Sequence, residues 1–273
     1  MLPAISQVCT LNSSFEQDIE DYAAGACHAV EIWLGKLDAY LERHTLEDVQ
    51  RLLAEHEMQA PVASFQGGLL TSQGDARREH WDLFGRRLKM CQTLGISTLV
   101  LAGDLLGPLT QQDLDRVMVS LKQAAELAGN HGVRLALEFQ AQATFANNLQ
   151  TAAALVAQVG SPHLGICFDV FHYYVGPSKL EDLGYLSAAN LFHVQLSDLS
   201  GQARELASDA DRIVPGDGDF QLEPMLEHFR NLDYRGHISL ELMNPQVWQN
   251  PARQVAEIGM TALRKLLGQA AMG

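Results

Sequence analysis

The feature of this sequence that most limits its fold is a regular alternation between short apolar runs and longer amphipathic stretches. The apolar runs have the length and composition of buried strands, and the amphipathic stretches repeat apolar residues at helical spacing. Strands are predicted at residues 4–9, 28–34, 61–65, 97–102, 133–138, 164–169, 191–196 and 237–241. Helices are predicted at residues 18–25, 46–58, 77–94, 109–131, from a cap at 147 or 148 to 159, and at 180–188, 222–231 and 255–267.

Eight strands alternating with about eight helices in 273 residues predict a fold of the α/β class, the (β/α)8 or TIM barrel. We expect it to form a single domain over residues 1–273. A doubly wound open sheet is the main alternative. It is disfavoured because Ser13 and Ser14 follow the first strand, where a dinucleotide-binding fold would carry a glycine-rich phosphate loop.

Composition indicates a soluble globular chain. There is no apolar run of about 18 residues that could cross a bilayer, and the N-terminus lacks the pattern of a signal peptide, so we expect a cytoplasmic protein. The four cysteines, Cys9, Cys27, Cys91 and Cys167, are far apart and form no CxxC pair. We therefore expect free, buried thiols rather than disulfides or a zinc ribbon.

The formal net charge of −14 bears on the partners of this chain. It argues against a nucleic-acid partner, because binding to a phosphate backbone depends on clustered lysine and arginine. It favours cations, and it does not exclude a small anionic substrate held by one or two arginines. The expected partner is a small carbohydrate-like molecule, with no membrane and with a homo-oligomer left open.

Three predicted strands end in a carboxylate, namely Glu138, Asp169 and Glu241. In a barrel, functional residues lie at the carboxyl ends of the strands and in the loops that follow. Any one of these acids could instead be a helix cap or a turn residue. Three together are better explained by a divalent metal ion, because crowded buried carboxylates repel one another unless a cation or protons compensate.

The seventh strand offers two further ligands. His193 and Gln195 lie two residues apart and share a face. Gln195 lies nearer the carboxyl end, so we prefer Gln195 as the ligand and His193 as a buried residue beneath it, which is also a candidate to contact substrate. The reverse assignment stays open, because imidazole is normally the stronger ligand. Three carboxylates with an amide suit Mn²⁺ or Mg²⁺, whereas a histidine favours Zn²⁺ or Co²⁺.

Four further residues follow these strand ends. His172 comes three residues after Asp169, where one helical turn could bring it over the metal to touch substrate. Asp198 is either a turn residue or a support for the ligands. Arg204 and Arg212 are cations of the long connection 200–220 and could hold substrate, although at least one of them is expected to be solvated.

Several short motifs taken together resemble those of the xylose isomerase-like TIM-barrel superfamily. They are LALE at Glu138, DxxH at Asp169, HVQLSD at 193–198, VPGDGDF at 214–220 and YRGHISLE ending at Glu241. The superfamily includes sugar epimerases, hydroxypyruvate isomerase, inosose dehydratase and 3-dehydroshikimate dehydratase. The resemblance implies that Glu138, Asp169, Gln195 and Glu241 bind the metal and that His172 contacts substrate.

The chain departs from ketose 3-epimerases at two positions. Those enzymes carry a further glutamate six residues after the first metal glutamate, and here Thr144 stands in its place. They also carry an arginine six residues after the strand-seven ligand, where this chain has Gly201, with Arg204 nearby.

The activity implied by the resemblance is metal-dependent enolisation of a keto-sugar or a related polyhydroxy carbonyl compound. The metal would stabilise an enediolate, Glu138 and Glu241 would act as general base and acid, and His172 would steady the oxyanion. Reprotonation makes the protein an isomerase or epimerase. Two alternatives stay open: a dehydratase of the 3-dehydroshikimate or inosose type, which is a lyase, and a barrel that binds metal or sugar without catalysis.

Overall fold

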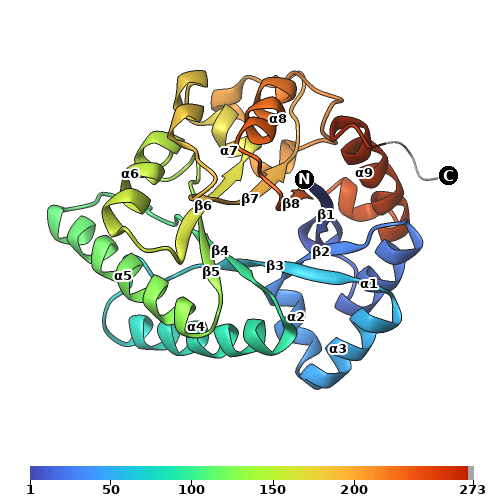
Figure 1. Cartoon of the computed structure of the whole chain (residues 1–273), viewed down its shortest axis with the longest axis horizontal. Helices are drawn as coiled ribbons and strands as arrows, with labels where there is room; N and C mark the ends of the chain where they lie inside the picture. The colour runs from blue at the N-terminus through green and yellow to red at the C-terminus, as the bar shows by residue number, and fades with distance from the viewer. Residues whose placement is uncertain (270–273) are drawn as a thin grey trace. The chain divides into compact units, whose positions relative to one another are not determined.

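The computed structural model describes residues 1–269. Eight parallel strands close in chain order into a barrel, with helices between them (Figure 1). The strands are β1 (Leu2–Ser6), β2 (Ala29–Trp33), β3 (Gln59–Gln66), β4 (Thr98–Ala102), β5 (Arg134–Glu138), β6 (Leu164–Asp169), β7 (Leu191–Leu196) and β8 (His237–Leu240). The prediction of a (β/α)8 barrel is confirmed.

The helices alternate with the strands, and several of them begin at capping residues. They are α1 (Phe15–Ala24), α2 (Leu34–Tyr40), α3 (Leu46–Glu55), α4 (Gly74–Leu94), α5 (Gln111–Asn130), α6 (Leu149–Val159), α7 (Val170–Val175), α8 (Leu222–Asn231) and α9 (Ala252–Leu266). Thr45 and Thr110 begin α3 and α5 with capping boxes, and Asn148 caps α6. None of the helices within residues 1–269 is both long and apolar enough to span a bilayer.

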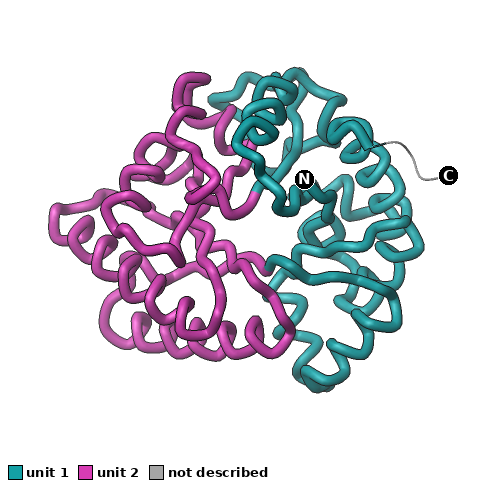
Figure 2. The backbone as a smooth tube through the Cα atoms, in the orientation of Figure 1, with its two compact units in different colours: residues 1–62, 194–273 teal, residues 63–193 magenta. Residues whose placement is uncertain are grey.

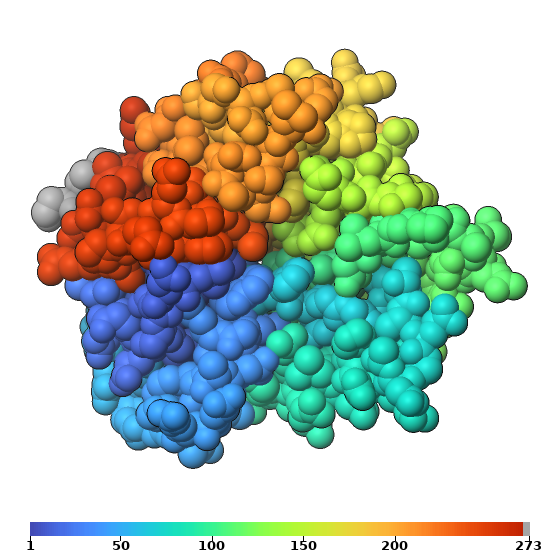
Figure 3. Space-filling model, turned by 180° about the vertical axis from the view of Figure 1, so that it is seen from behind, coloured from blue at the N-terminus to red at the C-terminus, as the bar shows by residue number. Residues whose placement is uncertain are grey.

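The chain divides into two compact units (Figure 2). Unit 1 comprises Met1–Val62 and Val194–Gly273, and unit 2 comprises Ala63–His193. In unit 1, β1 pairs with both β2 and β8, so the two ends of the chain are joined by strand pairing. Figure 3 shows the N-terminal segment in blue against the C-terminal segment in red. A Cβ at Gly25, which directly follows α1, would lie 2.6 Å from the Cβ of Ala256 in α9, so the glycine permits a close approach here.

In unit 2, the register of β4, β5 and β6 fixes the position of Glu138. Glu138 pairs with Ala102 on β4 and with Cys167 on β6. Beyond β4, the Gly103 N–H donates to the Glu138 carbonyl oxygen at 2.9 Å, and a Cβ at position 103 would lie 2.5 Å from that oxygen. Glycine is therefore required where the chain leaves β4, and the backbone of Glu138 is held from both sides.

The structure corrects three predicted elements. Residues 7–9 are not strand but part of the 3₁₀ helix η1 (Gln7–Thr10), whose Gln7 side chain is held by the Trp33 N–H and by Asp18. The segment predicted as helix 180–188 is the 3₁₀ helix η2 (Leu180–Tyr185). Helix α2 was not predicted, because only its first and fourth residues are buried and the stretch is too short to show helical periodicity.

Candidate functional site

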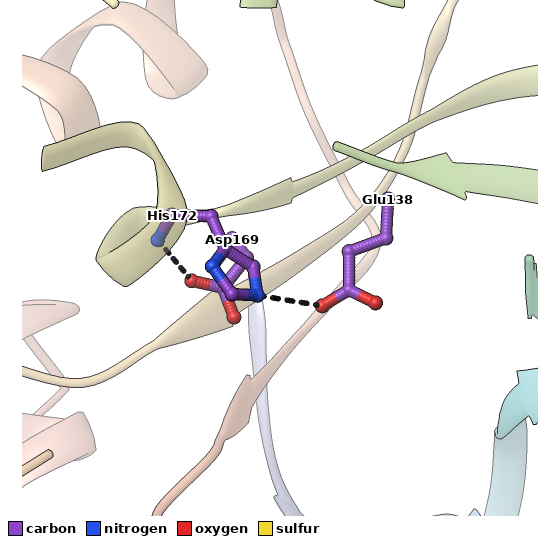
Figure 4. Close-up of side chains that lie close together, drawn as sticks. All are labelled: Glu138, Asp169 and His172. Carbon is purple, nitrogen blue, oxygen red and sulfur yellow. Dashed lines mark hydrogen bonds and ion pairs between the residues drawn. The ribbon is translucent and has the colours of Figure 1, made fainter. Parts of the chain in front are cut away.

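Unit 2 brings together Glu138, Asp169 and His172 (Figure 4). Glu138 and Asp169 are the last residues of β5 and β6, and His172 lies in α7, which begins directly after β6. Each residue offers one ligand atom, and these atoms lie within 4.8 Å of one another. All three side chains are buried. The sequence predicted the proximity of these three residues.

Asp169 orders the turn that carries the histidine. It is the N-cap of α7, and its Oδ1 accepts the His172 backbone N–H at 2.9 Å. The cap satisfies one of the amides that a helix leaves without an internal partner in its first turn. This local hydrogen bond explains why His172 lies over the end of β6, as the three-residue spacing predicted.

One contact of His172 favours a particular tautomer of its ring. The backbone N–H of Ala141 donates to His172 Nδ1 at 3.5 Å. A neutral imidazole that accepts at Nδ1 carries its proton at Nε2, and this atom lies 3.7 Å from Glu138 Oε1. In this tautomer Nε2 is a donor and has no lone pair for a metal. The geometry fits a residue that donates to an oxygen better than it fits a metal ligand.

The two carboxylates of unit 2 are an electrostatic cost to the folded protein. Burial of two negative charges this close together disfavours ionisation of both unless positive charge lies near them. A divalent cation supplies that charge and accepts carboxylate oxygens as ligands. The donor set of Glu138 and Asp169 therefore fits a hard divalent ion.

Unit 1 contains a second buried cluster, centred on Gln195. Gln195 Nε2 donates to Glu241 Oε1 at 2.9 Å and to Glu31 Oε1 at 3.0 Å. Gln195 lies on β7, Glu31 on β2, and Glu241 directly after β8, which ends at Leu240, one residue before its predicted end. Both hydrogens of the amide are used, so its carbonyl oxygen is the atom that Gln195 can offer to a cation.

Arg212 provides the positive charge of this cluster. It is only 1% exposed, and its Nη1 donates to Glu241 Oε2 at 3.0 Å. Its Nε and Nη2 donate to Asp209 Oδ1, and its carbonyl oxygen accepts from Asn244 Nδ2 at 2.9 Å. Charge-assisted hydrogen bonds of this kind stabilise the ionised form of Glu241.

Arg204 is not part of the buried cluster around Gln195. Its side chain is 57% exposed and pairs with its neighbour Glu205 at 3.2 Å. Six residues beyond Gln195 this chain has Gly201, and the arginine that contacts Glu241 is Arg212, further along the same connection. The signal available in the sequence was the position of Arg212 two residues before the VPGDG turn, which begins at Val214. His193 is fully buried on β7.

Asp198 is a turn residue. It is fully buried, and its carboxylate accepts the backbone N–H groups of Leu199, Gly216 and Phe220 at 2.9 to 3.0 Å. A Cβ at Gly218 would lie 2.4 Å from Asp198 Oδ1, so the glycine of this turn permits the close approach. Asp198 thus holds the start and end of the connection that carries Arg212.

Cys9 supports the end of β8. Its thiol donates to the Leu240 carbonyl oxygen at 3.4 Å and accepts the Leu242 N–H at 3.2 Å, one bond on each side of Glu241. Burial raises the pKa of the Cys9 thiol, so this group stays protonated and able to donate. The sequence analysis assigned Cys9 only to packing.

Each unit therefore carries buried carboxylates at the carboxyl ends of barrel strands, Glu138 and Asp169 in unit 2 and Glu241 in unit 1. The closed order of its parallel strands makes the chain a (β/α)8 barrel, a fold in which active sites lie at the carboxyl ends of the strands. Residues 20–266 match the model of the xylose isomerase-like TIM barrel family, and the chain belongs to this family.

Similar proteins include an isomerase and a dehydratase. The inosose isomerase of Bacillus velezensis is 26% identical over 251 residues, which cover 89% of this chain and 88% of that protein. The 3-dehydroshikimate dehydratase of Pseudomonas putida is 26% identical over 265 residues, which cover 93% of this chain but only 40% of that protein.

The fold is also shared with solved structures. A crystal structure described as IOLI protein with a binding zinc atom superposes with a TM-score of 0.91 over 98% of each chain, at 22% sequence identity. At this identity the similarity shows the fold.

Proposed function

We propose that this chain is a divalent-metal-dependent isomerase or epimerase of a keto-sugar or a related polyhydroxy carbonyl compound. The observation that carries the proposal is the buried cluster of Glu138, Asp169 and His172, in which two carboxylates and a proton-donating imidazole lie within 4.8 Å. The isomerase activity of the relative from Bacillus velezensis, similar over 89% of this chain, supports it.

Glu138, Asp169, Gln195 and Glu241 are the proposed metal ligands. They follow four successive strands of the barrel, β5 to β8, and in this fold residues from the ends of different strands serve one active site. His193 is the alternative to Gln195. The three carboxylates and an amide oxygen suit Mn²⁺ or Mg²⁺. The zinc atom in the similar crystal structure supports a divalent ion and keeps Zn²⁺ and Co²⁺ as candidates.

The proposed chemistry begins with removal of a proton next to the substrate carbonyl. When bound, the ion supplies Lewis-acid stabilisation of negative charge on the substrate oxygens. Glu241, which Arg212 holds in its ionised form, takes the proton. Glu138, which must be protonated for this step, gives a proton to the neighbouring carbon, and proton exchange with solvent then restores both carboxyl groups. His172 donates from Nε2 to the oxygen on which negative charge develops.

A dehydratase is the second candidate, because the dehydratase relative from Pseudomonas putida is similar over 93% of this chain. It would use the same first proton removal. Loss of a β-hydroxyl group as water would then replace reprotonation at carbon. His193 and Arg204 stay predictions as substrate residues in either case.

The experiment is hydrogen exchange in D₂O, followed by NMR, with inososes, ketohexoses and 3-dehydroshikimate as candidate substrates. With added Mn²⁺, the protein should incorporate deuterium next to the carbonyl of at least one compound. An isomeric product identifies an isomerase, and an unsaturated product with loss of water identifies a dehydratase.

Two variants test the assigned roles in that experiment. Glu138→Gln and Glu241→Gln should each abolish exchange while circular dichroism shows an intact fold. The experiment is repeated with Mg²⁺, Zn²⁺ and Co²⁺ in place of Mn²⁺. If no candidate compound exchanges deuterium with any of these four ions, the proposed enzymatic activity is overturned, and a barrel that binds metal or sugar without catalysis is favoured.

A further inference from the structure

We infer that Glu31 is a positioning residue that fixes the side-chain amide of Gln195, so that the carbonyl oxygen of Gln195 is the atom offered to the metal. The inference rests on the proposed function for the presence of the ion. It adds Glu31, on β2, to the residues proposed to act at the metal. The strand-end pattern of the sequence did not indicate this residue.

The hydrogen bonds of Gln195 carry the inference. Its amide nitrogen lies 3.0 Å from Glu31 Oε1 and 2.9 Å from Glu241 Oε1. An ionised carboxylate accepts hydrogen bonds and cannot donate them. A flipped amide would place its oxygen against two carboxylate oxygens in a buried site, which is repulsive. The two glutamates together therefore select one of the two amide orientations.

Glu31 is needed to select this orientation, because Glu241 alone would accept only one of the two amide hydrogens of Gln195. Arg212 draws Glu241 toward itself through Oε2, so the hydrogen bond from Gln195 to Glu241 depends on the loop that carries Arg212. Glu31 lies instead within strand β2, where Glu31 pairs with Ser6 of β1. It provides a fixed acceptor on the rigid barrel.

The burial of Glu31 favours a functional role over a packing role. Its side chain is fully buried, and a buried carboxylate costs free energy that an apolar side chain of similar size would not. A core position that served packing alone would be better filled by leucine or methionine. Residues that orient metal ligands are commonly worth a factor of about 10 to 100 in metal affinity.

The test compares two replacements of Glu31 in the full chain, with Mn²⁺ alone as the probe and its dissociation constant measured by calorimetry and by the Mn²⁺ EPR signal. Glu31→Met keeps the volume and removes the acceptor, and it should weaken Mn²⁺ binding by about 10-fold to 100-fold. Glu31→Gln keeps an oxygen that can accept from Gln195, and it should bind Mn²⁺ more tightly than Glu31→Met.

A double-mutant cycle separates positioning from a general structural or electrostatic effect. Gln195→Leu removes the amide, so Glu31→Met should cause no further loss of Mn²⁺ affinity in that background. Equal losses in both backgrounds would overturn the inference. Asp18→Asn is the control, because Asp18 is a buried, hydrogen-bonded acid of the same unit with no proposed ligand to hold. It should leave Mn²⁺ affinity unchanged.

The outcomes distinguish this inference from the proposed function. If the unmodified chain binds neither Mn²⁺ nor Zn²⁺, the proposed function fails and the inference fails with it. If the chain binds Mn²⁺ and Glu31→Met binds it equally well, only the role of Glu31 is overturned. Should Glu31→Met not fold, Glu31→Gln with and without Gln195→Leu completes the same cycle, and additive losses again overturn the inference.

Discussion

Arg212 Nη1 donates to Glu241 Oε2 over 3.0 Å, and both side chains are buried. The guanidinium is held on its other side by Asp209, so its position does not depend on Glu241 alone. A buried ion pair of this kind is costly to break, because removal of one partner leaves the other charge buried without compensation. The long connection between β7 and α8 is therefore tied to the residue proposed to take the substrate proton.

Replacement of Arg212 by methionine should destabilise the protein by about 3–5 kcal/mol, as expected for loss of one partner of a buried ion pair. Urea denaturation measures the change. Arg204→Met is the matched control, since Arg204 is exposed and pairs with its exposed neighbour Glu205. Its effect should stay within about 0.5 kcal/mol. Equal effects of the two variants would contradict the assignment of Arg212 to the buried cluster.

Asp198→Asn should loosen the connection that carries Arg212. The carboxylate accepts three backbone N–H groups, and an asparagine has only one oxygen to accept them. The Gly216 N–H would lose its acceptor, at a cost of about 1–3 kcal/mol. We expect faster proteolysis between residues 199 and 214, with Asp217→Asn, at an exposed position of the same turn, as a control that changes nothing. Unchanged proteolysis would show that Asp198 does not order the connection.

The fold could be predicted because its pattern is local. Strands β6 and β7 and helix α8 have the predicted bounds, since each apolar run is delimited by polar or turn residues. The strand-end acids followed from the same pattern, so the sequence predicted that Glu138 and Asp169 lie together. His172 followed from its spacing to Asp169, because one helical turn is a local structure.

The contacts that the sequence did not reveal are those between distant segments. Arg212 is 29 residues from Glu241, and its position depends on how the intervening connection folds, which no periodicity encodes. Glu31 and Gln195 are 164 residues apart and meet only because both side chains are buried in the same unit. The tautomer of His172 depends on a backbone N–H in another loop. Contacts of this kind can be identified only from the three-dimensional structure.

Replacement of His172 should lower turnover without loss of metal binding. In the tautomer that the Ala141 contact favours, His172 carries its proton at Nε2, so we expect it to act as a donor and not as a ligand. Loss of one donor to a developing oxyanion typically costs a factor of about 100 to 1,000 in rate. We therefore expect His172→Phe to slow deuterium exchange by that factor and His172→Gln, which restores an N–H, to recover part of it. A large loss of Mn²⁺ affinity in both variants would instead identify His172 as a ligand.

The stability of the protein should fall as the pH rises above the ordinary range of thiols, and Cys91 should account for part of the fall. Burial raises the pKa of the Cys91 thiol from 9.0 to about 12. Between these values the unfolded chain has released the proton and the folded chain keeps it. Deprotonation therefore lowers the free energy of the unfolded state relative to the folded state as the pH rises, and stability declines. At pH 10 the loss from one thiol is about 1 kcal/mol, since each pKa unit corresponds to about 1.4 kcal/mol.

Cys91→Ala isolates this contribution. The variant lacks the titrating thiol but shares every other group, including Cys27, whose pKa burial raises to about 11. Its cavity costs the same free energy at each pH. Urea denaturation at pH 8 and pH 10 should therefore show the advantage of the unmodified protein over Cys91→Ala shrinking by about 1 kcal/mol at the higher pH. An advantage that is independent of pH would mean that Cys91 ionises alike in the folded and unfolded chain.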